Sequence, residues 1–266
     1  MTDLGDRMKR YEGAAEHRLM SRLPVLARLD GRAFHSFTRG LLRPFDRRLH
    51  DLMVYTTTAL LAETGASVGY TQSDEITLAW APTDEFPWFG ARVQKMASSL
   101  ASFATLTFSR ALPAILPEKA SSAALFDARV WVVPDVREAS NAFLWREQDA
   151  TKNSISMLGQ AHFSHRQLHR KHSGQVQDML HEKGINWNDC EPWQKRGTWV
   201  RRVKTREPFT TEELDALPPL HEARKNPELM VERTRVGRVD MPPWSTVVNQ
   251  GAVLFGDAEP RTVQGR

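Results

Sequence analysis

The sequence has little of what would place it outside the cell or in a membrane. Cys190 is the only cysteine among 266 residues, so an intramolecular disulfide is excluded and a cytoplasmic location is the natural expectation. No apolar run approaches the roughly 18 residues that a membrane-spanning helix needs, so we expect no membrane partner. Residues 1–13 mix acidic and basic side chains and lack the apolar segment typical of a secretory signal.

Strong charge and the common nucleotide-binding motifs are also missing. Lys and Arg outnumber Asp and Glu by 36 to 32, which gives a net charge of +4 and a pI of about 9.4. This mild excess permits a nucleic-acid partner without demanding one. Neither a P-loop nor a Rossmann fingerprint is present, and the chain contains no internal repeat or low-complexity tract. What remains is a length sufficient for one sizeable core or a core with an appendage.

The hydrophobic patterns predict an α+β fold. We expect strands over 24–30, within 66–80 on both sides of a tight turn at 72–75, and over 127–133. A helix is expected from about Asp46 to Thr64, ended by Gly65, and another from Pro87 to about Arg110. This strand, helix, strand, strand, helix, strand order is the arrangement of the ferredoxin-like fold, an antiparallel sheet with packed helices.

Further elements follow this unit. Helices are predicted from about 137 to 164 and from 173 to 183, and a last strand over 197–203. Trp131 and Trp145 fit strand and helix patterns and are expected in the core. Residues 204–232 are charged and contain prolines, so they predict an extended or loosely helical insertion, and 243–257 include apolar pieces that could return to the sheet. We therefore predict one domain over 1–204 and a C-terminal extension over 205–266 that completes or flanks the sheet.

Acidic residues fall at two paired positions of this fold. Asp30 ends the first strand, while Asp74 and Glu75 lie in the turn between the second and third strands, which a ferredoxin-like unit places beside it. Close carboxylates repel one another, and a divalent cation relieves this repulsion. The alternative is that Asp30 belongs to an Asp-Gly turn and that residues 73–75 form a solvated hairpin tip. Taken together, the paired positions favour a metal site.

The strings around these acids resemble the tRNA-His guanylyltransferase family, which builds RNA in the 3′-to-5′ direction. They are LDGRAFHSFTRG at 29–40, RPFD at 43–46, GYTQSDEITL at 69–78, FDARVWVVPD at 126–135, FLWREQDATKNSI at 143–155 and KRGTWVRR at 195–202. The resemblance implies that 1–204 is a palm-like catalytic domain, as in polymerases. It also implies two Mg²⁺ ions held by Asp30, Asp74 and the carbonyl of Gly31, with Glu75 as a supporting catalytic residue.

The implied reaction has two nucleotidyl steps. A 5′-monophosphate on tRNA is activated with ATP or GTP, and the 3′-hydroxyl of an incoming GTP then attacks the activated end. The resemblance places the nucleotide phosphates around Gly31, Arg32, Ala33, Phe34, His35, Ser73 and Asp74. It adds two further nucleotide-binding sites. One is a basic cluster of Arg92 and Lys95, which would share a helix face, and the other is Asn153. Expected partners are tRNA, ATP, GTP and further copies of the chain in a dimer or tetramer.

The sequence departs from the family's pattern at a place that bears on which tRNA is the substrate. The eukaryotic branch carries a His-x-Ile-Asn-Asn run where this chain has Thr151, Lys152, Asn153 and Ser154. Thr151 replaces the histidine and only one asparagine remains. This puts histidine-tRNA specificity in doubt and is closer to the bacterial and archaeal "like" proteins, which mainly repair 5′-truncated tRNAs. Lys152 is a candidate for restoring a phosphate contact.

Four histidines at 162, 165, 169 and 172 would share one face if a single helix continued through them. A zinc site is conceivable, but a basic surface that touches RNA phosphates is the better interpretation, with His162, Arg166, Arg170, Lys171 and Lys152 as candidates. A plain solvated helix end is equally compatible. Two rival functions stay open: a palm-type nucleotidyl cyclase and a non-catalytic tRNA-binding module.

Overall fold

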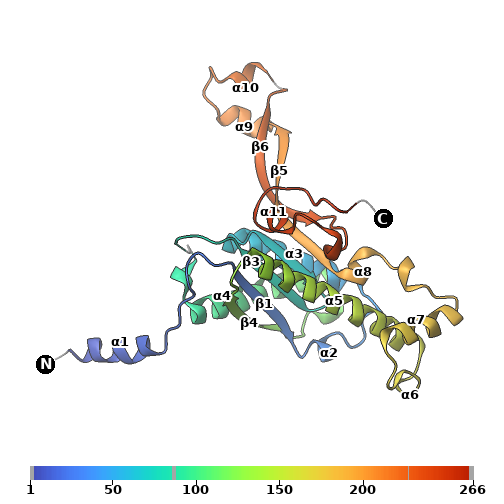
Figure 1. The fold of residues 1–266 in the computed structure, drawn as a ribbon. Coiled ribbons are helices and arrows are strands. Elements are labelled where there is room, and N and C mark those ends of the chain that lie inside the picture. The colour runs from blue at the N-terminus through green and yellow to red at the C-terminus, as the bar shows by residue number, and fades with distance from the viewer. Residues whose placement is uncertain (1–2, 86–87, 227, 264–266) are drawn as a thin grey trace.

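The computed structural model describes residues 3–85, 88–226 and 228–263 (Figure 1). Within them, an antiparallel six-stranded sheet has the order β4-β1-β3-β2-β5-β6. The strands are β1 (Val25–Arg32), β2 (Val68–Gln72), β3 (Glu75–Trp80), β4 (Leu125–Val132), β5 (Thr198–Pro208) and β6 (Met230–Val239). With α3 (Arg47–Thr64) between β1 and β2, and α4 (Val93–Ile115) between β3 and β4, the first four strands form the ferredoxin-like unit. The predicted fold class is confirmed.

Helices α3 and α4 cover one face of the sheet. The Asp46 side chain caps α3 by accepting a hydrogen bond from the Arg48 N–H, and Gly65 ends it at a positive φ of 70°. The α4 boundaries differ from the prediction: Pro87 lies outside the described residues, and α4 continues past Arg110. The core between the sheet and these helices includes Leu29, Ile76, Leu52, Leu60, Leu100 and Phe108.

The opposite face is covered by α5 (Val136–His162), with a 3₁₀ turn (Trp244–Thr246) and α11 (Gln250–Phe255). Phe143 of α5 stacks on Trp199 of β5 with ring centroids 5.0 Å apart, and Trp244 approaches Trp199 at 4.6 Å. The apolar pieces predicted to return to the sheet are therefore helical and pack on its face. Trp145 does not belong to this core, because it is 52% exposed.

Strands β5 and β6 extend beyond the sheet as an arm, with the short helices α9 (Thr211–Ala216) and α10 (Glu222–Lys225) at its tip (Figure 1). Only Thr198 to Arg201 of β5 pair with β2, whereas β5 pairs with β6 as far as Pro208. The division expected at residue 204 thus falls inside a strand. The extension both completes the sheet, through β6, and flanks it, through α11.

The remaining elements are short or peripheral. Helix α1 (Leu4–Ala14) projects from the body in Figure 1 and has no buried residue. Around the sheet lie α2 (Phe34–Phe37), α6 (His165–Leu168), α7 (Ser173–Glu182), α8 (Pro192–Arg196) and the 3₁₀ turns Phe89–Ala91, Pro117–Lys119 and Trp187–Asp189. Across the described ranges, none of the helices combines the length and apolarity needed to cross a bilayer.

Candidate active site

The acids predicted to meet do meet. Asp30 pairs in register with Glu75 across β1 and β3, and the Gly31 N–H donates a hydrogen bond to the Asp74 carbonyl oxygen at 3.0 Å. Asp30 and Gly31 lie inside β1 rather than in a turn. Burial raises the pKa of Asp74, and the neighbouring charge of Asp30 raises it further. The Asp30 and Asp74 carboxylates therefore lie near each other where β1 ends and the β2–β3 turn begins.

Glu75 is held differently from the other two acids. Arg146 of α5 donates to both of its carboxylate oxygens, from Nε at 2.6 Å and from Nη2 at 2.7 Å, and Arg28 lies 4.0 Å away. Burial raises the pKa of Glu75, while the charges of the two arginines act against this rise. Because its charge is already paired, Glu75 suits the supporting role expected for it better than direct metal coordination.

The donor set at this edge fits a Mg²⁺-like ion. Within the described residues, the Asp30 carboxylate has no hydrogen bond or ion pair, and no three His, Cys, Asp or Glu side chains are placed together as a metal cage. Mg²⁺ rarely needs such a cage, since it binds one or two carboxylates and completes its shell with waters and substrate phosphates. The close backbone approach at Gly31 also needs glycine, because a Cβ there would lie 2.4 Å from the Phe34 ring.

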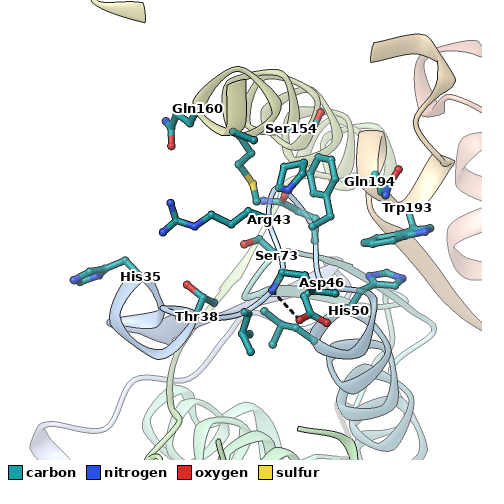
Figure 2. A pocket seen from close by; sticks show the side chains of 18 residues that line it. His35, Thr38, Arg43, Asp46, His50, Ser73, Ser154, Gln160, Trp193 and Gln194 are labelled. Carbon is teal, nitrogen blue, oxygen red and sulfur yellow. Dashed lines mark hydrogen bonds between the residues drawn. The ribbon is translucent and has the colours of Figure 1, made fainter. Parts of the chain in front are cut away.

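A cavity of about 390 Å³ has Gln72 and Ser73, the two residues before Asp74, in its lining (Figure 2). It lies between α2, the segment before α3, the β2–β3 turn, α5 and α8. His35 and Ser73 were predicted from the sequence, whereas most of the lining was not, although the RPFD string lies in it and the KRGTWVRR string follows Gln194. The lining residues are His35, Thr38, Leu41, Leu42, Arg43, Pro44, Phe45, Asp46, Leu49, His50, Gln72, Ser73, Ser154, Met157, Gln160, Ala161, Trp193 and Gln194.

One wall of this cavity is fixed by polar contacts. Asp46 accepts hydrogen bonds from the Leu42 N–H at 3.1 Å and from Arg48, whose side-chain hydrogen bond lowers the Asp46 pKa. His50 stacks on Trp193 with centroids 4.4 Å apart, and its Nε2 lies 3.1 Å from Thr198 Oγ1. Burial lowers the pKa of His50 to about 4, so its imidazole is neutral at physiological pH.

Comparisons with known proteins identify the family. A model described as tRNAHis guanylyltransferase matches residues 5–134. A solved bacterial tRNA(His) guanylyltransferase-like protein in complex with ATP aligns with a TM-score of 0.71 and 43% identity over 75% of this chain and 87% of that one. The chain belongs to the tRNA-His guanylyltransferase family. It is accordingly a nucleotidyltransferase with the palm-like fold of that family.

Other relatives agree with this assignment. A bacterial family-like protein in complex with GTP aligns with a TM-score of 0.68 and 34% identity over 91% of this chain and 94% of that one. An uncharacterized protein of Acanthamoeba polyphaga mimivirus is 30% identical over 76% of this chain and 78% of its own length. The tRNA(His) guanylyltransferase of Schizosaccharomyces pombe is 26% identical over 73% of this chain and 78% of its own length.

The loop expected to cradle phosphates is built as a tight corner. Arg32 ends β1 and is exposed, and Ala33 follows at a positive φ of 56°. Phe34 is only 3% exposed and packs against Phe37, Phe108 and Phe126. The Phe34 ring thus anchors the corner in the core, while His35 is exposed and belongs to the lining of the cavity.

The structure does not bring Arg92 and Lys95 to the acids. Both lie at the start of α4, near the end of β3, whereas Asp74 and Glu75 lie at its beginning. The strand from Glu75 to Trp80 spans about 17 Å. Arg92 is also engaged, with an ion pair of 3.4 Å to Glu16. The basic cluster predicted here therefore does not belong to the acidic site of the same chain.

Asn153 and Lys152, predicted to contact nucleotide or RNA, follow Arg146 along α5. Arg146 Nη2 donates to Asp149 at 2.9 Å, and Asn153 Nδ2 donates to the same carboxylate oxygen at 3.5 Å. Asn153 is thus joined to the Glu75 network, while Lys152 is exposed beside it. Their contacts to nucleotide or RNA stay predictions.

The histidines do not form one helical stripe. α5 ends at His162, α6 runs from His165 to its C-cap His169, and His172 caps α7, so the four side chains are divided among three elements. A capping box of Ser164 and Gln167 begins α6, and one of His172 and Gln175 begins α7. The exposed Arg166, Arg170 and Lys171 keep the region basic.

Proposed function

We propose that this protein adds nucleotides, with a preference for GTP, to the 5′ end of tRNA in the 3′-to-5′ direction. The observation that carries the proposal is the pair of unneutralised carboxylates, Asp30 and Asp74, beside a cavity of about 390 Å³. Family membership and the two solved relatives, complexes with ATP and with GTP, support it.

In the proposed first step, the tRNA 5′-phosphate attacks the α-phosphorus of ATP, and pyrophosphate leaves. In the second step, the 3′-hydroxyl of GTP attacks the activated 5′-phosphorus, a phosphodiester bond forms, and AMP leaves. Asp30, Asp74 and the Gly31 carbonyl would hold two Mg²⁺ ions, which when bound activate the attacking oxygen and stabilise the leaving phosphate. Such a reaction depends on positioning and charge neutralisation more than on covalent help.

The cavity suits the nucleoside part of a triphosphate. Its volume is within the range of small-molecule sites, and its lining combines Phe45 and Trp193 with polar groups such as Ser73 and Gln194. Ser73, which lines the cavity, immediately precedes Asp74, so a nucleoside in the cavity would direct its phosphates toward the acids. His35 also lines the cavity, and the exposed Arg32 directly follows Gly31.

Repair of 5′-truncated tRNA is the activity we favour over addition of G to tRNA-His. Thr151 stands where the histidine-tRNA branch carries its histidine. The bacterial family-like structures are 43% and 34% identical to this chain, whereas the Schizosaccharomyces pombe enzyme is 26% identical.

The test incubates the protein with 5′-monophosphorylated tRNAs, full-length or lacking the first nucleotide, together with ATP, GTP and Mg²⁺. We expect extension of the truncated tRNA, and none after chelation of Mg²⁺ or with Asp30→Asn or Asp74→Asn. The matched control Asp178→Asn removes an exposed carboxylate on α7 and should leave activity unchanged. Absence of extension by the wild type would refute the proposal, and cyclic or linear dinucleotide products would favour the cyclase.

We also propose that the chain works in the cytoplasm as a homo-oligomer. Helix α1 supports the homo-oligomer. Its apolar residues Leu4, Met8 and Tyr11 are 61%, 45% and 67% exposed. They recur at helical spacing, and none of them is buried against another part of the described chain. Tyr11→Lys should reduce the mass measured by light scattering in solution, whereas Lys9→Ala, on the same helix, should not. A wild-type monomer would refute the oligomer.

A further inference from the structure

An exposed tryptophan stands next to the acidic site. Trp145 lies on α5, one residue before Arg146, which binds Glu75. Its ring has the Arg146 guanidinium 4.4 Å and the Arg28 guanidinium 5.7 Å from its centroid. Both arginines also approach Glu75, so they approach Trp145 from the side of the sheet. An indole that is 52% exposed nevertheless leaves much of its surface to solvent.

The strand surface beside Trp145 carries guanidinium groups. Ala27 and Leu29 of β1 point into the core beneath α3 and α4, so Arg28 and Asp30 point to the α5 side. In register with them on β4 lie Arg129 and Asp127, both exposed. We call Trp145, Arg28, Arg129 and Asp127 the tryptophan shelf.

Arg28 on this shelf has hydrogen-bond donors that are not used within the described residues. Its Nε is buried and has no hydrogen-bond partner among the described residues, and its ion pair with Glu75 is as long as 4.0 Å. Arg129 has only a 3.5 Å contact with Asp127. An exposed aromatic ring with guanidinium groups beside it is the combination that binds single-stranded nucleic acid, by stacking a base and holding its phosphate.

The shelf and the cavity flank the acids from two sides. Ser154 and Met157 line the cavity from α5, and Trp145 lies nine or more residues earlier on that helix, which corresponds to about 14 Å. Between them, Arg146 and Asp149 connect to Glu75, the register partner of Asp30. A reaction that joins two substrates at the acids needs a separate route of access for each substrate.

We propose that Trp145 is a positioning residue that stacks the nucleobase of the RNA's 5′-terminal nucleotide, while the nucleotide to be used occupies the cavity. The inference rests on the proposed function, in which an RNA 5′ end must reach Asp30 and Asp74. Charge favours RNA over a protein surface here, because Arg28 lies 5.7 Å from the ring centroid and its register partner Arg129 is exposed. In a truncated acceptor the 5′-terminal base closes the last base pair, and its open face would stack on the indole.

The decisive experiment is a binding cycle that needs no catalysis. Two 5′-monophosphorylated truncated tRNAs are compared by fluorescence anisotropy, one intact and one with an abasic 5′-terminal nucleotide. With the wild type, loss of the base should weaken binding about tenfold, as expected for one stacked base. Trp145→Ala should bind intact RNA about tenfold more weakly and lose little more with the abasic RNA, whereas Trp145→Phe should recover most of the affinity.

Controls separate this inference from the proposed function. Tyr55→Ala removes a ring that is 53% exposed on α3, on the other face of the sheet, and should change neither RNA affinity nor extension. Trp145→Ala should leave ATP affinity without RNA unchanged and raise KM for tRNA more than it lowers kcat. If the abasic penalty is equally large in Trp145→Ala, or if the wild type does not bind tRNA, the inference is overturned. If binding follows the cycle but no nucleotide is added, only the proposed function fails.

Discussion

Arg146 binds Glu75 through two short hydrogen bonds, from Nε to Oε1 at 2.6 Å and from Nη2 to Oε2 at 2.7 Å, although the residues lie 71 positions apart. Both side chains are buried. The pair connects α5, which lies on one face of the sheet, to the hairpin that carries Asp74. It therefore fixes the helix that lines the cavity relative to the two acids.

Breaking the Arg146–Glu75 ion pair should lower the stability of the fold. Arg146→Met would leave the buried Glu75 carboxylate with only the more distant Arg28, and we expect a loss of about 3–5 kcal/mol in the free energy of unfolding, measured by urea denaturation. The double variant Arg146→Met with Glu75→Gln should recover part of this loss, because no buried charge is left unpaired. Arg137→Met, at an exposed position of α5, is the control, and an equal loss there would contradict the prediction.

Gly31 should not tolerate even alanine. The added Cβ would lie 2.4 Å from Phe34 Cδ2, and the core around that ring cannot yield easily, so we expect a loss of about 1–3 kcal/mol in stability. Extension of tRNA should fall as well, because the Gly31 N–H holds the Asp74 carbonyl. Gly13→Ala in α1 meets nothing within 4 Å and should not destabilise the protein. Combining Gly31→Ala with Phe34→Leu should restore part of the stability if the clash is the cause.

The ferredoxin-like unit was predictable because each of its elements shows its own signal. The apolar spacing in α3, its Asp46 cap and its Gly65 end are all local. The meeting of Asp30 with Asp74 follows from the order of these elements alone. Boundaries were less certain, since α4 begins after a corner that includes Gly90 at a positive φ rather than at Pro87.

Features that depend on what covers a surface could not be predicted. Periodicity places Trp145 on a helix but does not show that the residue is 52% exposed. The spacing of Arg92 and Lys95 gives a shared helix face but not the edge of the sheet at which that face lies. The break after His162 had a local signal that spacing alone overlooked, because Ser164 and Gln167 form a capping box.

His50 should make the protein less stable in acid. Its folded pKa of about 4 is below the usual 6.5, so folding favours the neutral ring. The stabilisation is complete above about pH 6.5 and is lost as pH falls toward 4, by a total of about 3 kcal/mol for this one group. In His50→Gln, which retains a polar partner for Thr198 but does not titrate, the free energy of unfolding should change less between pH 7 and 4. An unchanged slope would assign the acid sensitivity to other groups.

The C-terminal extension should be required for folding of the catalytic domain rather than being dispensable. Trp244 is fully buried, its indole Nε1 donates to the Ser140 carbonyl at 3.0 Å, and its backbone N–H donates to Glu147 at 2.8 Å. Trp244→Ala should therefore lower the free energy of unfolding, measured by urea denaturation, by about 3–5 kcal/mol, as for other buried large-to-small changes.

Truncation tests the same dependence. A chain ending at residue 204 exposes the Trp199 surface and should fail to show a cooperative unfolding transition. Deleting only the tip, residues 210–228, with a short turn in its place should preserve that transition, because the tip contributes one buried residue, Ala223, among those described. A stable 1–204 fragment would show instead that residue 204 is a true domain boundary.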